Sequence, residues 1–299
     1  MSVSFASARA AAREAAAAQH YPQGALYVVA TPIGNLADIS LRALHVLELA
    51  DVVACEDTRH TQQMLRAYGI DKTSQQLLAL HQHNEAEATL LVLERLRQGL
   101  RVAYVSDAGT PGISDPGARL ASSVAAQGLR CIPLPGASSV TCLLSVAGVL
   151  SDKGFIFQGF LSSKAAERAS AVQALAAEQR AVLLLEAPHR IEALAGALAV
   201  LGRRPLTVGR ELTKPFEDIV TLAAADFPAW LAQDANHLRG EFALVLHGAP
   251  PSEEAGQDLR VLTLLLAELP LKTAVKLAAE ITGQSRNALY ERALELKKQ

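Results

Sequence analysis

Short apolar runs alternate with stretches of helical spacing through the first half of the chain. The runs are short and apolar, as buried strands are, and they are Ala25–Ala30, Val52–Cys55, Leu77–Leu80, Arg101–Ser106 and Leu129–Pro133. Apolar residues three and four positions apart predict a helix after each of the first four runs. This alternation predicts a mostly parallel sheet with helices on both faces.

Residues suited to helix ends flank these predicted helices. Asp38 or Ser40 can cap the first helix, and Gly69 and Gly99 follow the second and third, where glycine commonly ends a helix. Asp115 precedes Pro116, the order expected when a capping carboxylate is followed by proline at the first helical position. A direct functional role is the alternative for Asp115.

The pattern changes after about residue 151. Five further runs are predicted strands, namely Phe155–Phe160, Ala181–Glu186, Leu206–Arg210, Ile219–Leu222 and Phe242–His247. Helical spacing lies between them only at Ala165–Ala177 and Ile191–Leu201. With fewer helices between its strands, this half predicts a second α/β domain with a mixed or antiparallel sheet.

Composition divides the chain into five parts. Residues 1–23 are Ala-rich and predict a frayed, partly helical extension. Residues 24–150 and 151–248 form the two α/β domains, and the Pro/Gly-rich, acidic residues 249–256 form a linker. Residues 257–299 are predicted to be helical, with Lys272–Ile281 and Arg286–Leu296 joined by a short turn in a helix-turn-helix-like pattern. From Lys272 onward six Lys or Arg and three Glu give a local charge of +3.

Composition narrows the class of protein. A length of 299 residues suits about two domains, and a net charge of −2 excludes a chain that is basic throughout. Thirteen aromatic residues are too few for a base-stacking platform. Cys55, Cys131 and Cys142 lack metal-site spacing, so they predict reduced thiols and no metal. No segment has the pattern of a membrane span or secretory signal, which predicts a cytoplasmic protein.

Three loops rich in glycine and proline follow predicted strands. They are Thr31–Leu36, Asp107–Gly117 and Pro133–Ser139. Because ligands of open α/β sheets bind beyond the carboxyl ends of the strands, we expect these loops to share one crevice. None of them has the GxGxxG or GxxxxGK[ST] spacing of a dinucleotide or nucleotide-triphosphate site.

Charged clusters also stand at strand ends. Glu56–His60 offers two carboxylates beside an arginine and a histidine, and the alternative is a capped helix start with a surface ion pair. Glu186–Arg190 and Arg210–Lys214 carry cations suited to phosphate oxygens. The glutamates of these two segments either hold the arginines or contact a ligand. His81 and His83 predict a polar or RNA-facing surface, since no third metal ligand accompanies them.

The sequence resembles the tetrapyrrole (corrin/porphyrin) methylase family. The segments TPIGNLADIS, EDTRHT, VSDAGTPGISDPG and PLPGASS carry this resemblance, which covers the chain from about Gly24 to its end. The segments ALHQHNE, EAPHRI and GRELTKPFED and the C-terminal helices resemble its ribosomal RNA branch. The tetrapyrrole branch typically has a Gly-rich first loop with Gly-Pro, so the TPIGNL loop favours the RNA branch.

The resemblance implies an S-adenosyl-L-methionine-dependent enzyme that methylates the ribose 2′-oxygen of a cytidine in small-subunit (16S) ribosomal RNA, near the decoding centre. It implies two α/β domains with the cofactor between them, a homodimer and no metal. The acceptor is either free RNA or the assembled 30S subunit.

The resemblance also implies roles for individual residues. The cofactor-binding residues are Pro32, Asp107, Gly109, Thr110, Ile113, Pro135 and Ala137, with Leu185 and Gly240 from the second domain. Arg59 and one of Glu56 or Asp57 are the catalytic residues, with the carboxylate acting as the base. His60, Arg190, Arg210 and Lys214 are the RNA-binding residues.

Two other functions are consistent with parts of the pattern. The cofactor would also serve methylation of a tetrapyrrole ring carbon, against which the TPIGNL loop, the Glu56–His60 cluster and the basic tail argue. The helical tail would also suit a nucleic-acid-binding regulator with a degenerate catalytic domain.

Overall fold

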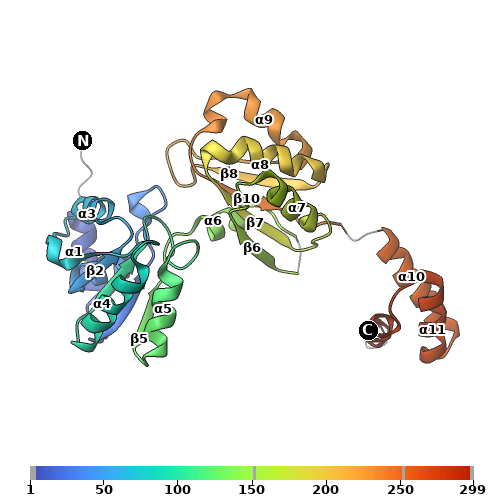
Figure 1. Ribbon diagram of the computed structural model, residues 1–299, viewed down its shortest axis with the longest axis horizontal. Helices are drawn as coiled ribbons and strands as arrows, with labels where there is room; N and C mark the ends of the chain where they lie inside the picture. The colour runs from blue at the N-terminus through green and yellow to red at the C-terminus, as the bar shows by residue number, and fades with distance from the viewer. Residues whose placement is uncertain (1–4, 151–152, 251–252, 297–299) are drawn as a thin grey trace.

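Figure 1 shows the computed structural model, which describes residues 5–150, 153–250 and 253–296. Two α/β domains follow one another along the chain, and a helical part forms the C-terminal end. Each α/β domain holds one five-stranded sheet. The predicted fold class is therefore confirmed, with two sheets and a separate helical element.

The first sheet is parallel throughout. Its strand order is β3-β2-β4-β1-β5, and its strands are β1 (Ala25–Val29), β2 (Val52–Cys55), β3 (Leu77–Ala79), β4 (Val102–Val105) and β5 (Arg130–Leu134). Both faces are covered, because β1, β2 and β4 are almost entirely buried. The carboxyl ends of all five strands therefore meet at one edge of the sheet.

Four helices connect these strands as predicted. They are α2 (Leu41–Leu49), α3 (Thr58–Ala67), α4 (Glu85–Arg97) and α5 (Gly117–Ala126). Ser40, rather than Asp38, caps α2, and its hydroxyl accepts a hydrogen bond of 3.1 Å from the Ala43 N–H. Gly69 ends α3 with a φ of +72°, a conformation that a side chain disfavours.

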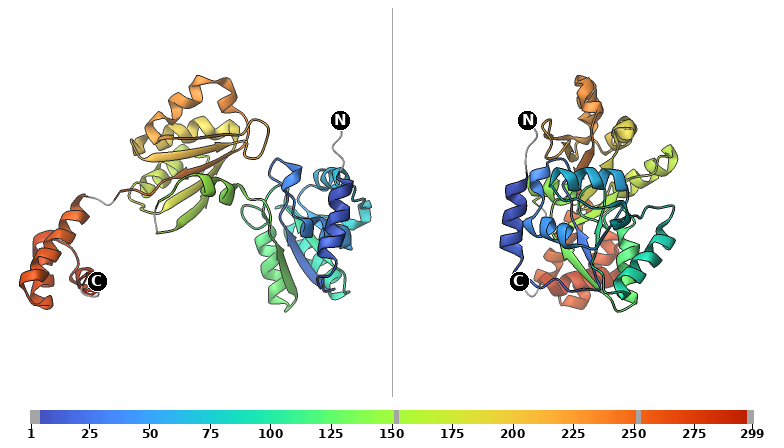
Figure 2. Two further views of the ribbon diagram at one scale, coloured as in Figure 1. Left: turned by 180° about the vertical axis from the view of Figure 1, so that it is seen from behind. Right: turned by 90° about the vertical axis from the view of Figure 1, so that its left-hand side faces the viewer.

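The Ala-rich N-terminal segment forms a packed helix, where the sequence predicted a frayed extension. Helix α1 (Ala6–Ala16) lies along the outer side of the first domain (dark blue in Figure 2) and packs against α2. Its Ala12 and Ala16 are fully buried, and Arg13 forms an ion pair with Glu48. Small side chains allow this close approach of two helices, which apolar periodicity alone did not indicate.

The second sheet is mixed, with strand order β6-β7-β10-β8-β9. Its strands are β6 (Phe155–Gly159), β7 (Ala181–Glu186), β8 (Pro205–Arg210), β9 (Asp218–Ala223) and β10 (Phe242–Leu246). Only β6 and β7 pair in parallel. Helices α7 (Ala165–Leu175) and α8 (Ile191–Leu198) were predicted, whereas α9 (Phe227–Gln233) was not.

Helix α6 (Ser139–Val146) lies between the two sheets (Figure 1) and was also missing from the prediction. Its Val140 and Leu143 are buried in one apolar cluster with Leu183 and Val245 of the second sheet. The chain thus crosses from one domain to the other on a helix that packs against the second domain.

The C-terminal part consists of α10 (Glu253–Glu268), α11 (Leu271–Thr282) and α12 (Arg286–Leu296). Helices α11 and α12 and the turn between them are as predicted. Because α10 starts at Glu253, the second half of the predicted linker is helical. Leu262, Val275 and Leu289 form a small core shared by the three helices. Lys297 and Lys298, counted in the tail charge, lie outside the described residues.

A buried arginine joins three elements of the second domain. Arg204 is only 7% exposed, and its guanidinium donates hydrogen bonds to the carbonyl oxygens of Leu175, Glu178 and His247. Burial lowers the pKa of Arg204, although the charge of Glu178 partly opposes this effect. The arginine therefore satisfies carbonyl groups where α7 and β10 end and β8 begins.

We predict that Arg204→Met lowers the free energy of unfolding by about 3 kcal/mol, because it leaves buried carbonyl groups without donors. Urea unfolding of the purified protein measures this change. The neighbouring Arg203 is exposed, so Arg203→Met is the matched control and should change stability by less than about 0.5 kcal/mol. Equal effects of the two substitutions would contradict the role assigned to Arg204.

Candidate functional site

A cleft of about 420 Å³ lies between the two α/β domains. The first domain lines it with loops that follow β1, β2, β4 and β5, and the second domain with β7, β10 and adjoining loops. The lining residues are Ile33, Glu56, Ser106–Thr110, Ile113–Asp115, Ser138–Val140, Phe160, Leu185–Pro188, Leu212 and Glu241–Ala243. The predicted convergence of three loops on one crevice is confirmed.

Backbone hydrogen bonds join the first loop to the second. The Thr31 N–H donates to the Gly109 carbonyl at 2.9 Å, and the Gly109 N–H donates to the Thr31 carbonyl at 3.1 Å. Gly109 has a φ of +81°, which glycine adopts without steric strain. Ile33 lines the cleft from the first loop, whereas the predicted cofactor residue Pro32 is not among the lining residues.

The third loop joins the other two through Thr110. Its hydroxyl donates a 3.0 Å hydrogen bond to the carbonyl oxygen of Ala137. Pro135 and Ala137, both predicted to bind the cofactor, are not among the lining residues, whereas Ser138 and Ser139 of the same segment are. Four of the predicted cofactor residues in the first domain line the cleft directly, and they are Asp107, Gly109, Thr110 and Ile113.

Asp115 both caps a helix and lines the cleft. One carboxylate oxygen accepts hydrogen bonds from the Gly117 N–H at 2.7 Å and the Tyr104 hydroxyl at 3.0 Å, and the other accepts from the Gly112 N–H at 2.7 Å. Asp115 thus accepts from the first N–H of α5, but Pro116 stands at the N-cap position and the helix begins at Gly117, so proline is not at the predicted first helical position. These bonds fix the shape of the second loop.

A reciprocal pair of hydrogen bonds connects the ends of β2 and β4. Glu56 accepts from the Asp107 N–H at 3.1 Å, and Asp107 accepts from the Asp57 N–H at 3.2 Å. Burial, together with the charges of Asp107 and Asp115, raises the pKa of Glu56. Since Glu56 also lines the cleft, it is the residue of this cluster best placed to take up a proton there.

Asp57 and Arg59, two of the three predicted catalytic residues, are not among the residues that line the cleft. Asp57 caps α3 by accepting from the N–H groups of Arg59 and His60. The Arg59 side chain is 91% exposed and forms an ion pair of 3.1 Å with Asp57. Hydrogen bonds from Arg59 hold the pKa of Asp57 at about 2. The alternative of a capped helix start with a surface ion pair describes these two residues.

Glu186 and Arg190 form a pair at the end of β7. The two side chains are 3.0 Å apart, and Arg190 also donates to the carbonyl oxygen of Leu161. Glu186 and its neighbour Leu185, a predicted cofactor residue, line the cleft, whereas Arg190 does not. The structure thus favours the alternative in which the glutamate holds the arginine.

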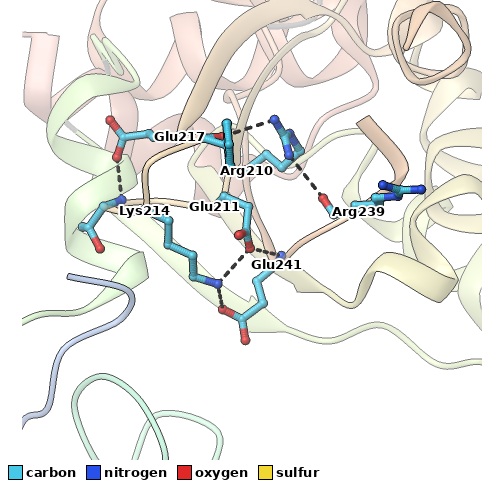
Figure 3. Close-up of polar contacts among 8 residues, drawn as sticks. Arg210, Glu211, Lys214, Glu217, Arg239 and Glu241 are labelled. Carbon is cyan, nitrogen blue, oxygen red and sulfur yellow. Dashed lines mark hydrogen bonds and ion pairs between the residues drawn. The ribbon is translucent and has the colours of Figure 1, made fainter. Parts of the chain in front are cut away.

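Figure 3 shows how the cations of the next segment are held. Arg210 is 8% exposed and donates to the carbonyl oxygens of Phe216 and Arg239 at 3.2 and 3.5 Å. Lys214 donates to Glu211 at 2.8 Å and to Glu241 at 3.0 Å. Arg210 therefore braces its loop, and Lys214 has two anionic partners. Their contact with RNA phosphate stays a prediction.

The same loop brings the two domains together. A Cβ atom on Gly34 would lie 2.3 Å from Cγ of Lys214, so only glycine fits between the first loop and this segment. Glu211 and Thr213 adopt positive φ values of 53° and 67°. The predicted cofactor residue Gly240 does not line the cleft, and a Cβ atom there would lie 2.3 Å from Cγ of Glu211.

Several lining residues were absent from the sequence prediction. Ile33, Ser138, Phe160, Leu212 and Phe242 are small or apolar and carry no chemical signal of their own. Ile33, Ser138 and Leu212 lie inside segments that the sequence analysis singled out, whereas Phe160 and Phe242 lie at the ends of predicted strands. Within the described ranges, no cluster of three or more His, Cys, Asp or Glu side chains could hold a metal ion. None of the described helices is long and apolar enough to cross a membrane.

Two family models match the chain. The model described as Tetrapyrrole (Corrin/Porphyrin) Methylases matches residues 25–227, which include all the cleft-lining residues except Glu241–Ala243. The model described as RsmI C-terminal HTH domain matches residues 252–297, the helical C-terminal part.

The chain is similar over nearly its whole length to proteins named "Ribosomal RNA small subunit methyltransferase I". The Pseudomonas aeruginosa protein is 49% identical over 278 residues, covering 91% of this chain and 97% of its own. The Escherichia coli O157:H7 protein is 46% identical, covering 91% of this chain and 96% of its own.

Solved structures share the arrangement of the two sheets at low identity. Uroporphyrin-III-C-methyltransferase from Thermus thermophilus has a TM-score of 0.53 at 22% identity, covering 75% of this chain and 94% of its own. A cobalt precorrin-4 methyltransferase has a TM-score of 0.53 at 18% identity, covering 77% and 98%. From the matched residues and the relatives together, the chain belongs to the tetrapyrrole (corrin/porphyrin) methylase family.

Proposed function

We propose that this protein transfers the methyl group of S-adenosyl-L-methionine to the ribose 2′-oxygen of a cytidine in small-subunit ribosomal RNA, near the decoding centre. The observation that carries the proposal is the 42–49% identity, over about nine-tenths of the chain, to proteins named for methylation of that RNA. The match of the C-terminal helices to the RsmI domain model supports the same substrate class.

The composition of the cleft supports binding of the methyl donor. Its volume of about 420 Å³ falls in the range of small-molecule sites. The loop around Gly109 presents backbone groups, while Leu185, Leu212 and Ala243 give an apolar wall. The donor supplies an electrophilic methyl group on a sulfonium. A cleft that excludes water and fixes the acceptor oxygen in line with that methyl group accelerates such a transfer by positioning.

Glu56 is our candidate for the general base. Transfer forms a bond between the ribose oxygen and the methyl carbon as the carbon–sulfur bond breaks, and the hydroxyl proton must leave. The Glu56 carboxylate lines the cleft and has a raised pKa, so it is a stronger base than an ordinary glutamate. The hydrogen bond from the Asp107 N–H fixes its orientation.

Exposed cations on the first domain and on the C-terminal helices support the contact with RNA. Arg59 and His60 are exposed at the start of α3, next to Glu56, and we assign them to phosphate or ribose contacts. Lys272, Lys276 and Arg292 are exposed on the C-terminal helices and suit the same RNA backbone. Binding to free RNA or to the assembled 30S subunit would take place in the cytoplasm.

A homodimer is part of this proposal. Edge strand β6 exposes Phe155 at 50% and Phe157 at 37%, and α6 and the turn after it expose Val146 at 56% and Leu150 at 100%. Exposed apolar side chains on a strand with a free edge are typical of a surface covered by another chain. We assign a second copy of this chain to that surface.

We predict that the purified protein transfers labelled methyl from S-adenosyl-L-methionine to small-subunit ribosomal RNA or to assembled 30S subunits. Mass mapping of the product should place the methyl group on a cytidine ribose. Uroporphyrinogen serves as the control acceptor and should remain unmethylated. RNA from a strain lacking the protein that still carries the same 2′-O-methylcytidine would overturn the proposed function.

We predict that Glu56→Gln lowers the rate of methyl transfer by about 100-fold or more, because a base is lost. The amide oxygen still accepts from Asp107, so donor affinity measured by calorimetry should stay within about threefold. The wild-type rate should rise with pH as Glu56 deprotonates, since the carboxylate is the active form, and level off above its raised pKa.

Single-turnover rates at several pH values test this assignment. The variant should lack the rising limb, and Glu87→Gln on the exposed side of α4 should retain it. A variant at Glu56 with the wild-type pH profile would exclude this residue as the base.

We predict that Phe157→Glu weakens self-association at least 100-fold, because it places a charge in an apolar interface. Sedimentation velocity should show twice the 31.7 kDa chain mass for the wild type and the single-chain mass for the variant. Val200→Glu changes an exposed apolar residue on the helical side of the second domain and should remain dimeric. A monomeric wild-type protein, or a dimeric Phe157→Glu variant, would contradict the assigned surface.

A further inference from the structure

Glu186 lines the cleft and has one carboxylate oxygen without a hydrogen-bond partner among the described residues. Its side chain is 1% exposed and lines the cleft at the end of β7. Oε1 accepts a hydrogen bond of 3.0 Å from the Ala187 N–H and pairs with Arg190 at 3.0 Å. Oε2 is fully buried and has no hydrogen-bond partner among the described residues. A buried carboxylate oxygen normally has a donor, so this atom points to a missing ligand group.

The environment of Oε2 defines the kind of group that fits it. A carboxylate oxygen only accepts, so the ligand must donate through N–H or O–H. Arg190 already balances the charge of Glu186, which removes the need for a cation. The neighbouring lining residues Leu185, Pro188 and Ala243 are apolar and suit a flat ring. An amino group at the edge of such a ring matches both requirements.

We propose that Glu186 Oε2 accepts a hydrogen bond from the exocyclic amino group of a nucleobase bound in the cleft. This inference rests on the proposed function, whose reaction brings two such bases to the site. They are the adenine of the methyl donor and the cytosine of the acceptor nucleotide. Carboxylates accept readily from amino groups of both kinds, and they reject bases that present a carbonyl at the same position.

Because Oε1 of Glu186 already has two partners, replacing the other carboxylate oxygen with an amide nitrogen tests the proposal. In Glu186→Gln, the Ala187 N–H and Arg190 both require an acceptor, so the amide oxygen takes the place of Oε1. The amide nitrogen then occupies the position of Oε2. The site would present a donor where it had presented an acceptor, and its preference for an amino group over a carbonyl should reverse.

Calorimetry with two ligands tests the donor as the source of the amino group. S-adenosylhomocysteine carries the amino group, and S-inosylhomocysteine carries a carbonyl in its place. We expect wild-type protein to bind the adenine compound at least tenfold more tightly. Glu186→Gln should lose at least tenfold in affinity for that compound while binding the inosine compound as well as wild type or better.

Methyl transfer to RNA with cytidine or uridine at the modified position tests the acceptor as the source. If the cytosine amino group is the partner, both donor analogues bind both proteins alike. The variant then loses at least tenfold of the wild-type preference for cytidine. Glu192→Gln, on the exposed side of α8, is the matched control and should resemble wild type in both arms.

Two outcomes overturn the assignment in distinguishable ways. If wild-type protein binds S-adenosylhomocysteine and methylates RNA, but neither preference changes in Glu186→Gln, only the role of Glu186 fails. If wild-type protein does neither, the proposed function fails and this assignment with it. A wild-type protein that shows neither preference would also overturn the assignment, and this outcome requires no variant.

Discussion

The cleft depends on the hydrogen bonds that join loops from separate strands. Thr31 and Gly109 exchange two backbone bonds, and Glu56 and Asp107 are linked through a side chain and an N–H. Loops on a protein surface are normally mobile, because few contacts hold them. Here each loop is held by its neighbour, so the lining residues keep their relative positions without a bound ligand. Such preorganisation lowers the cost of ordering the site on binding.

The two sheets make different contributions to the same cleft. The parallel sheet directs all its carboxyl ends to one edge, where β1, β2, β4 and β5 each supply a polar loop. The mixed sheet lines the cleft with residues of the strands β7 and β10, and the buried pair Glu186–Arg190 lies at the end of β7. Gly34 permits the first loop to approach Lys214 of the second domain. Polar loops of the first domain and apolar residues of the second domain therefore meet at the cleft between the two domains.

Sequence alone predicted features that depend on local chemistry. The loop at Asp107–Gly117, a cap at Asp38 or Ser40 and the strands β2 and β7 follow from composition and spacing within a few residues. It did not predict α6 and α9, since both are short and their apolar residues lack a clear period. The roles of Arg210 and Lys214 were also inaccessible. Each has one local partner, Phe216 or Glu211, but the other partners, Arg239 and Glu241, lie far along the chain and meet them only in the folded domain.

Glu56 and Asp57 are adjacent, yet one faces the cleft and the other caps α3. Glu56 and Asp57 are the only two residues between the end of β2 at Cys55 and the start of α3 at Thr58, so each residue has one of the two roles. Inserting or deleting one residue here would move a carboxylate out of its place even if every side chain were kept. The turn therefore tolerates changes of residue type more readily than changes of length, and an altered spacing in a related chain would signal a different chemistry at this edge.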